Sequence, residues 1–161
     1  MLLSSEHPLA SVRNSFNAVF VHGDAVDDVM FYGRGAGEFP TASAVMGDII
    51  DVIRDMVNGC TGRISNTCYR ELPVKKCRDI RSKFFLRMQV ENRPGVLASI
   101  ASVFGEHKVS INKVVQKIIT DGMAEVVIVT DAVKEYHMQD AQEELLCMPI
   151  VKEISSVIRE Y

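Results

Sequence analysis

The sequence has no run of apolar residues close to the roughly 18 that a membrane-spanning helix requires. Its first ten residues, MLLSSEHPLA, lack the basic segment and the long apolar core of a secretory signal. An excess of positive charge is also missing, because the net charge is −3, and this argues against nucleic-acid binding by bulk electrostatics. We therefore expect a cytoplasmic protein with neither a membrane nor a nucleic acid as partner.

Cysteine is scarce, and its spacing matches no common metal site. Cys60, Cys68, Cys77 and Cys147 are separated by eight, nine and seventy residues, unlike zinc or iron–sulfur patterns. We expect reduced thiols and no bound metal, with disulfides as the less favoured alternative. The 47% hydrophobic and 24% charged residues are typical of a globular protein.

Two apolar-rich regions flank a basic segment. Residues 61–83 hold seven Lys or Arg against two acids, so the rest of the chain carries about −8. The segment contains a single aromatic residue, Tyr69, and therefore no ladder for stacking bases. We interpret residues 61–82 as a solvated connector between two domains.

The first region predicts a β-hairpin followed by one helix. Strand-like runs at 16–21 and 29–32 flank a turn at His22-Gly23-Asp24, and Thr41 is a candidate cap for the helix. The apolar positions of this helix recur at helical spacing: Val45, Ile49, Val52, Ile53 and Met56. A hairpin and one helix are too few to close a core, so this helix face needs a further partner.

The second region predicts a ferredoxin-like βαββαβ domain, which makes the fold class α+β. FFLRMQV alternates as a half-buried strand does, and Thr120-Asp121-Gly122 is a hairpin signal. In the two helices, the residues expected to face the core are Val96, Leu97, Ile100, Ala101, Phe104, Met138, Ala141, Leu145 and Leu146. The expected elements are strands at 84–90, 109–119, 123–130 and 150–158 and helices at 96–105 and 135–146. Because the two helices cover only one face of the sheet, the other must be solvated or paired with a second copy, and we expect oligomerisation.

The glycine loop YGRGAGE looks like a dinucleotide-binding fingerprint but has the wrong spacing. Gly33, Gly35 and Gly37 form G-x-G-x-G, and Glu38 stands where the third glycine belongs. The preceding unit is a hairpin rather than the first strand of a βαβ unit. The loop is therefore either a tight strand-to-helix turn or a bare backbone that something approaches closely, and a phosphate would suit the helix N-terminus behind it.

The motif ENRPGVLASIASVF, residues 91–104, places a polar turn between a strand and a buried helix. The Asn92 amide and the free N–H groups of the first helical turn suit the carboxylate of a small amino acid, although a plain structural turn is the alternative. No catalytic constellation appears, because the histidines are scattered and the Lys75-Lys76 pair lies in the connector. Catalysis by this chain alone is not expected.

Two segments together resemble one enzyme family. ENRPGVLASIASVFGEHKVSINKVVQK resembles an ACT domain, the small-molecule regulatory module of amino-acid metabolism. HPLASVRNSFNAVFVHGD and YGRGAGEFPTASAVMGDI resemble the C-terminal part of the catalytic region of homoserine dehydrogenase. The resemblance implies three parts: residues 1–60 as the end of that catalytic domain, 61–82 as the connector and 83–161 as the ACT domain. It also implies that the chain is a C-terminal fragment.

This resemblance implies an NAD(P)-dependent oxidoreductase that reduces L-aspartate 4-semialdehyde to L-homoserine, in threonine and methionine biosynthesis. The cofactor fingerprint, the catalytic lysine and the substrate-binding acids of such enzymes would lie upstream of this chain. The fragment would then be inactive alone and would hold neither NADP nor NAD by itself. The resemblance places a group of residues against the cofactor of the intact enzyme: Gly35, Ala36, Gly37 and Thr41.

The ACT resemblance implies dimerisation and feedback regulation by an amino acid, threonine being the expected effector. The ligand would lie at a domain–domain interface, between the first strand–helix turn and the start of the second strand. The residues implied are Asn92, Pro94, Gly95, Val96 and Leu97 in the turn, with Ser110, Ile111 and Asn112 on the strand. Related serine-binding ACT domains have His and Asn at the positions of Val90 and Ser110. A freestanding ACT-type module without catalytic role is the alternative.

Overall fold

The computed structural model describes residues 1–60, 71–118 and 122–160 and divides them into two compact units. The larger unit comprises residues 1–3 and 73–161, and the smaller comprises residues 4–72. No helix in the described ranges is long and apolar enough to cross a membrane.

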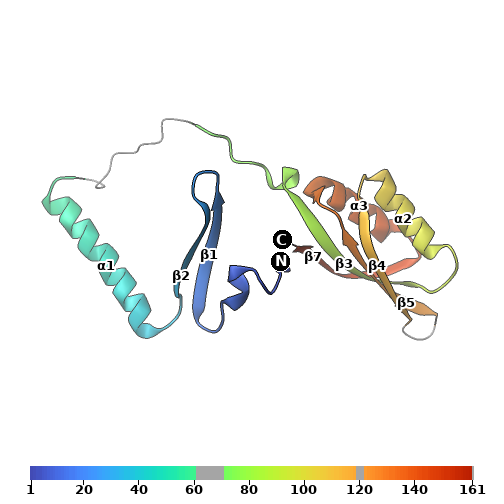
Figure 1. The fold of residues 1–161 in the computed structure, drawn as a ribbon, viewed down its shortest axis with the longest axis horizontal. Coiled ribbons are helices and arrows are strands. Elements are labelled where there is room, and N and C mark those ends of the chain that lie inside the picture. The colour runs from blue at the N-terminus through green and yellow to red at the C-terminus, as the bar shows by residue number, and fades with distance from the viewer. Residues whose placement is uncertain (61–70, 119–121, 161) are drawn as a thin grey trace. The chain divides into compact units, whose positions relative to one another are not determined.

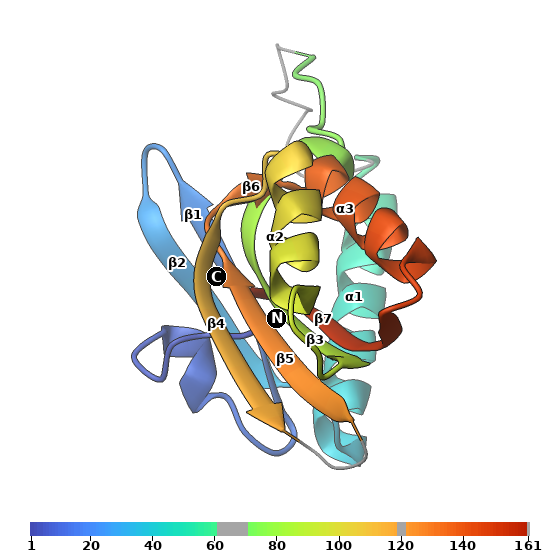
Figure 2. The same ribbon diagram turned by 90° about the vertical axis from the view of Figure 1, so that its right-hand side faces the viewer.

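The larger unit is a five-stranded antiparallel sheet covered on one face by two helices (Figure 2). Strand β3 is central and pairs with β5, β6 and β7, while β4 forms the edge beyond β5. The elements are β3 (Arg81–Glu91), α2 (Val96–Glu106), β4 (Ile111–Ile118), β5 (Met123–Thr130), β6 (Val133–Lys134), α3 (Glu135–Cys147) and β7 (Val151–Glu160). This order confirms the expected βαββαβ plan, with the short β6 added.

Strict alternation in β3 and β5 builds the core between the sheet and the helices. In β3, Phe84, Leu86, Met88 and Val90 are buried, and the residues between them face the other side of the sheet. This is the two-residue period of a strand with one covered face. The buried apolar residues of the described chain all fall between positions 84 and 151, so the core belongs to this unit alone.

The helices differ from the expected core stripes at three positions. In α2 the buried residues are Val96, Ile100, Val103 and Phe104. Leu97 and Ala101 are exposed instead, because the helix is rotated so that Val103 faces the sheet. Leu146 is also exposed, since it lies beside Leu145, which takes the inward position in the last turn of α3. These three expectations were wrong.

A β-turn containing a proline and a glycine immediately precedes α2. Val96 N–H donates to the Arg93 carbonyl at 3.4 Å, and Gly95 has a φ of 89° and a ψ of −15°. These are the features of a type II β-turn with proline at its second position and glycine at its third. Pro94 therefore precedes the helix rather than standing in its first turn, and Gly95 supplies the positive φ that the turn requires.

The smaller unit contains a β-hairpin and one long helix (Figure 1). Strand β1 (Phe16–Gly23) pairs with β2 (Asp27–Arg34) from Phe16↔Arg34 to Gly23↔Asp27. The predicted hairpin is therefore present, but its turn is at 24–26, because His22 and Gly23, which were expected in the turn, are paired residues of β1. A 3₁₀ turn, η1 (Pro8–Ser11), precedes it, and helix α1 (Glu38–Val57) follows it.

Helix α1 begins four residues earlier than the sequence indicated. Its N-cap is Gly37, and Thr41 lies inside, where its N–H donates to the Gly37 carbonyl at 3.2 Å. Pro40 is tolerated because N–H groups of a first helical turn have no partner inside the helix. Thr41 as the cap was therefore wrong.

No residue of α1 is buried, and its apolar side chains are exposed along its whole length. The most exposed are Phe39, Met56 and Val57. A soluble helix is normally covered on its apolar face. The expectation that this helix needs a partner outside its own segment agrees with this exposure.

The connector expected at 61–82 is described only in part. Residues 61–70 and the hairpin turn at 120 and 121 lie outside the described residues. Residues 71–80 contain one 3₁₀ turn, η2 (Cys77–Asp79), and Arg81 already begins β3. Cys60, Cys77 and Cys147 are free thiols, whereas Cys68 lies outside the described chain.

Candidate functional site

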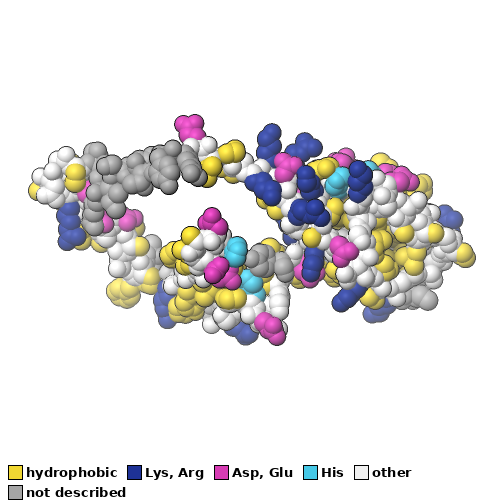
Figure 3. Space-filling model, turned by 45° about the horizontal axis from the view of Figure 1, so that its top comes forward, with side chains coloured by type: hydrophobic (Ala, Val, Ile, Leu, Met, Phe, Trp, Pro, Cys, Tyr) yellow, Lys and Arg dark blue, Asp and Glu magenta, His cyan; other side chains and the backbone are white. Residues whose placement is uncertain are grey.

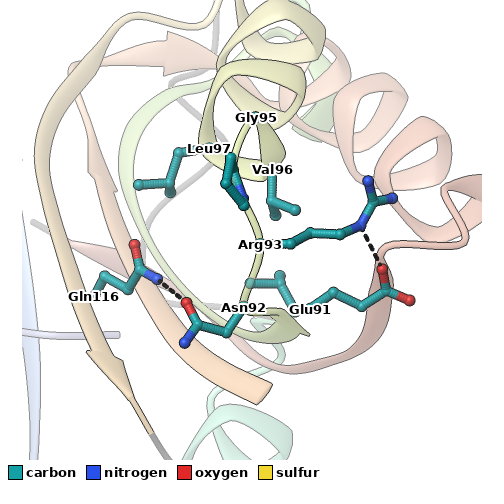
Figure 4. Close-up of a pocket in the computed structure, with 9 residues that line it drawn as sticks. Glu91, Asn92, Arg93, Gly95, Val96, Leu97 and Gln116 are labelled. Atoms are coloured by element: carbon teal, nitrogen blue, oxygen red, sulfur yellow. Dashed lines mark hydrogen bonds and ion pairs between the residues drawn. The ribbon is translucent and has the colours of Figure 1, made fainter. Parts of the chain in front are cut away.

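A cavity of about 370 Å³ lies at the turn between β3 and α2 (Figure 4). It collects the five turn residues that the sequence predicted, and it adds four that were not predicted. The predicted ones are Asn92, Pro94, Gly95, Val96 and Leu97, and the additional ones are Val90, Glu91, Arg93 and Gln116.

The cavity offers hydrogen-bond donors to an anion. The first-turn N–H groups of α2 at Leu97 and Ala98 have no acceptor within a helix, and no acidic residue stands in that turn. Asn92 is held by its backbone, since its N–H donates to the Gly122 carbonyl at 2.7 Å. Its side-chain Oδ1 accepts from Gln116 Nε2 at 3.3 Å, so the amide Nδ2 is left to donate.

Among the described residues that line this cavity, Glu91 carries the one carboxylate, and it is already paired. Glu91 Oε2 accepts from Arg93 Nε at 2.8 Å, and Glu91 Oε1 lies 2.9 Å from Lys152 Nζ. Hydrogen bonds from Lys152 and then Arg93 lower the pKa of Glu91. The cavity thus presents amide donors for a carboxylate, whereas its one anionic group is engaged by two cations.

The acid unfolding of the larger unit tests this pairing. Because the pKa of Glu91 is lower in the folded protein than its ordinary value of 4.5, Glu91 contributes stability above that pH, and the contribution is lost as the pH falls through the folded pKa. We expect Glu91→Gln to flatten the fall of the thermal midpoint below about pH 4.5. Glu143→Gln, at an exposed position on α3, is the control. An unchanged acid slope in Glu91→Gln would contradict the assignment.

The strand residues predicted for the same site lie elsewhere in this chain. Ser110 immediately precedes β4, and Ile111 pairs with Thr130. Asn92 follows the opposite end of β3, beside Gly122. A single chain therefore does not bring Ser110, Ile111 and Asn112 to the Asn92 cavity, and Gln116, from farther along β4, reaches it instead.

Ser110 and Asn112 bind a carboxylate that the sequence did not single out. Ser110 Oγ donates to Asp131 Oδ2 at 2.8 Å, and Asn112 Nδ2 donates to Asp131 Oδ1 at 3.0 Å. The hydrogen bond from Asn112, followed by that from Ser110, lowers the pKa of Asp131. What this end of β4 presents to a ligand is therefore an exposed carboxylate with two fixed neighbours.

The glycine loop of the smaller unit passes close to the Asn17 side chain. A Cβ added at Gly35 would lie 1.8 Å from the Asn17 amide nitrogen, so a larger residue there requires this exposed side chain to move. Gly37 has a φ of 129° and precedes α1 without any side-chain cap. The tight turn expected from the sequence accounts for both residues.

These loop residues do not fit a site that holds a dinucleotide by itself. Gly35, Ala36, Gly37 and Thr41 are exposed, Pro40 removes one donor, and the Glu38 carboxylate stands in the first turn of α1. The pyrophosphate of a dinucleotide needs several convergent N–H donors, and Gly35, Gly37 and Thr41 carry no cationic side chain to offset Glu38. The loop can contact a cofactor only where other residues hold that cofactor in place.

Family comparisons agree with the two units. The sheet unit matches the ACT domain model over residues 84–147, and its fold is the ferredoxin-like one, so this part of the chain is an ACT domain. Residues 1–50 match the homoserine dehydrogenase model. Taken together, the chain corresponds to a C-terminal portion of homoserine dehydrogenase that ends in an ACT domain.

Individual relatives cover nearly the whole chain. Homoserine dehydrogenase from Corynebacterium glutamicum is 43% identical over 98% of the chain, and that from Bacillus subtilis is 41% identical over 98%. The crystal structure of a homoserine dehydrogenase from Thiobacillus denitrificans superposes with a TM-score of 0.80 at 29% identity over 99% of the chain. The chain spans only 35%, 37% and 37% of these three proteins, about a third of their length.

Proposed function

We propose that the chain supplies the end of the catalytic domain and the regulatory domain of an NAD(P)-dependent homoserine dehydrogenase. Residues 1–60 would complete the catalytic domain, 61–82 would connect the two, and 83–161 would bind an amino acid and dimerise. The observation that carries the regulatory role is the Asn92 cavity with its unengaged donors. The match of residues 1–50 to the homoserine dehydrogenase model supports the catalytic assignment. The intact enzyme would operate in the cytoplasm.

The donors at the cavity suit one end of an amino acid. The Asn92 Nδ2 group and the first-turn N–H groups of α2 can bind a carboxylate, and the positive end of the helix dipole favours it. The ammonium group needs an acceptor, and Glu91 is already occupied by Arg93 and Lys152. The cavity of one chain therefore recognises half of the ligand.

A second copy paired along β4 would complete the site. Strand β4 is the edge of the sheet, and the exposed Val114 and Val115 lie near its centre. Antiparallel pairing about these two residues sets the Ser110 end of one copy beside the Gln116 end of the other. Ser110, Ile111, Asn112 and the Asp131 carboxylate would then approach the Asn92 turn of the partner copy, where Asp131 can accept from an ammonium group.

Regulation would follow from linkage between ligand and assembly. An amino acid that binds across two copies favours the paired arrangement, and the paired arrangement binds the amino acid more tightly by the same factor. Threonine, as the product expected to feed back, is our proposed effector. In the intact enzyme the connector would carry this preference to the catalytic domain.

Calorimetric titration of the full chain with threonine tests the site. We expect saturable binding, with Asn92→Ala weakening it by about tenfold because a charge-assisted hydrogen bond is lost. Asp131→Asn is expected to weaken it too, although Asp131 and Asn92 lie at opposite ends of the sheet in one chain. Asn58→Ala, at the end of α1, is the matched control.

Sedimentation in the same titration reports the assembly. Threonine is expected to raise the dimer fraction of the wild-type chain but not of Asn92→Ala. No heat with threonine or other small amino acids at millimolar concentration would contradict the effector site. A separate titration with NADPH is expected to show no binding, because the loop at Gly35 does not form a holding site.

A further inference from the structure

A second cavity, of about 390 Å³, lies at the other end of β5 from the Asn92 turn. Four basic side chains line it, drawn from β3, from the segment before β4, from β6 and from α3: Arg81, Lys108, Lys134 and His137. Figure 3 shows Lys and Arg side chains gathering at this end of the larger unit, next to the connector. The chain as a whole has a net charge of −3, so this cluster of basic side chains is a local excess of positive charge.

The acids near this cavity do not neutralise it. Asp131 is the one carboxylate among its lining residues, and it stands against the three cations Arg81, Lys108 and Lys134. Glu135, the next acid along the chain, is buried and held by two hydrogen bonds from Arg159. Asp79 lies outside the lining residues, on η2. The basic side chains are thus left with surplus positive charge.

Several of the cations are held in place. Arg81 Nη2 donates to the Ala132 carbonyl at 2.8 Å, which orients the rest of the guanidinium. Lys134 Nζ and Arg78 Cζ lie 5.6 Å and 5.4 Å from the centroid of the Tyr136 ring, within the range of cation–π attraction. A cavity with pre-positioned donors loses less conformational entropy when it binds.

Lys108 occupies a backbone position that favours glycine. It follows α2 with a φ of 59°; its N–H donates to the Gly105 carbonyl at 3.0 Å, and the Val109 N–H donates to the Phe104 carbonyl at 2.8 Å. This is a Schellman motif, in which the left-handed residue is usually glycine. A lysine there costs stability, and its ammonium group contributes to the cavity.

We propose that this cavity binds a small multivalent anion through phosphate groups, as a diphosphate or a phosphate monoester would present them. Phosphate oxygens accept hydrogen bonds from guanidinium and ammonium groups at once, and the bound charge relieves the repulsion among the cations. Arg81 of the basic segment 61–83 lines the cavity, and Arg78 of the same segment lies over the ring of the lining residue Tyr136. The cavity shares Ser110 and Asp131 with the proposed amino-acid site, whereas variants at Arg81 and Lys134 test the anion site alone.

Calorimetric titration of the full chain with inorganic pyrophosphate is the test. We expect one saturable site, with Arg81→Gln and Lys134→Gln each weakening binding by about tenfold. Lys113→Gln removes the same charge from β4, away from the cavity, and is expected to leave the affinity unchanged. Titration with ADP and with adenosine separates the contribution of phosphate from that of the base.

The Lys108→Gly variant separates the loss of a binding group from a folding defect, because the two change the melting temperature in opposite directions. We expect this variant to melt at a higher temperature than the wild type and yet to bind pyrophosphate more weakly. The proposal is overturned by a lack of saturable binding at millimolar pyrophosphate, or by an equal loss of affinity in Lys113→Gln. Tighter binding of single-stranded RNA than of ADP would overturn it as well, because it would indicate an extended nucleic-acid surface.

Discussion

Replacing Phe104 with alanine is expected to lower the free energy of unfolding of the larger unit by about 3–5 kcal/mol. The ring is fully buried in α2 between the helix and the sheet, so the substitution leaves a cavity that a close-packed core cannot refill. Urea denaturation followed by far-ultraviolet circular dichroism measures the change.

Leu97→Ala on the same helix is the matched control. Leu97 is 39% exposed, so its truncation is expected to cost less than about 1 kcal/mol. If the two variants lost the same stability, the burial pattern of α2 described here would be wrong. The comparison separates loss of core packing from loss of helix propensity.

Replacing Arg159 with methionine is expected to cost about 2–4 kcal/mol of stability. Arg159 donates from Nε and Nη2 to the two carboxylate oxygens of Glu135, at 2.8 Å and 2.6 Å. Because Glu135 is only 5% exposed, removal of the guanidinium leaves a buried carboxylate without its partner. The same pairing raises the pKa of Arg159, so the arginine stays charged throughout.

The reverse substitution, Glu135→Gln, is expected to cost less, about 1–2 kcal/mol. Arg159 is half-exposed, and water can take the place of the lost carboxylate. The double variant Glu135→Gln with Arg159→Met is expected to be more stable than Arg159→Met alone, since it has no buried charge. Thermal and urea unfolding of the three variants measures this order, and a double variant less stable than either single one would contradict it.

The sequence predicted the ACT unit well because its local signals agree with each other. Alternation placed β3 and β5, and proline and glycine located the turn before α2. Helix α2 exposed the limit of such reasoning, because Leu97 and Val103 are both apolar and the sequence does not say which one faces the sheet. Only the packing of α2 against α3 and β3 decides that rotation.

The candidate site was predicted in part for a similar reason. The turn residues are neighbours in sequence, so a motif could find them together. Gln116 reaches Asn92 only through the register of β4 on β5 and of β5 on β3, which is a tertiary property. Asp131 follows β5 and meets Ser110 through the same register. The polar character of both residues was visible in the sequence, whereas their positions were not.

Helix α1 illustrates the opposite case, in which the element was predictable and its environment was not. The spacing of its apolar residues predicted the helix, but the burial of those side chains depends on residues outside the helix. Its exposed side chains include Ile49, Ile53 and Met56.

The exposure of α1 also bears on how long the chain survives in a cell. Chaperones and proteases act on chains that expose apolar segments, and they remove such chains from the pool. An assembly that covers α1 would hide this signal. Copies in which α1 stays uncovered are therefore expected to be cleared faster than copies in which it is covered.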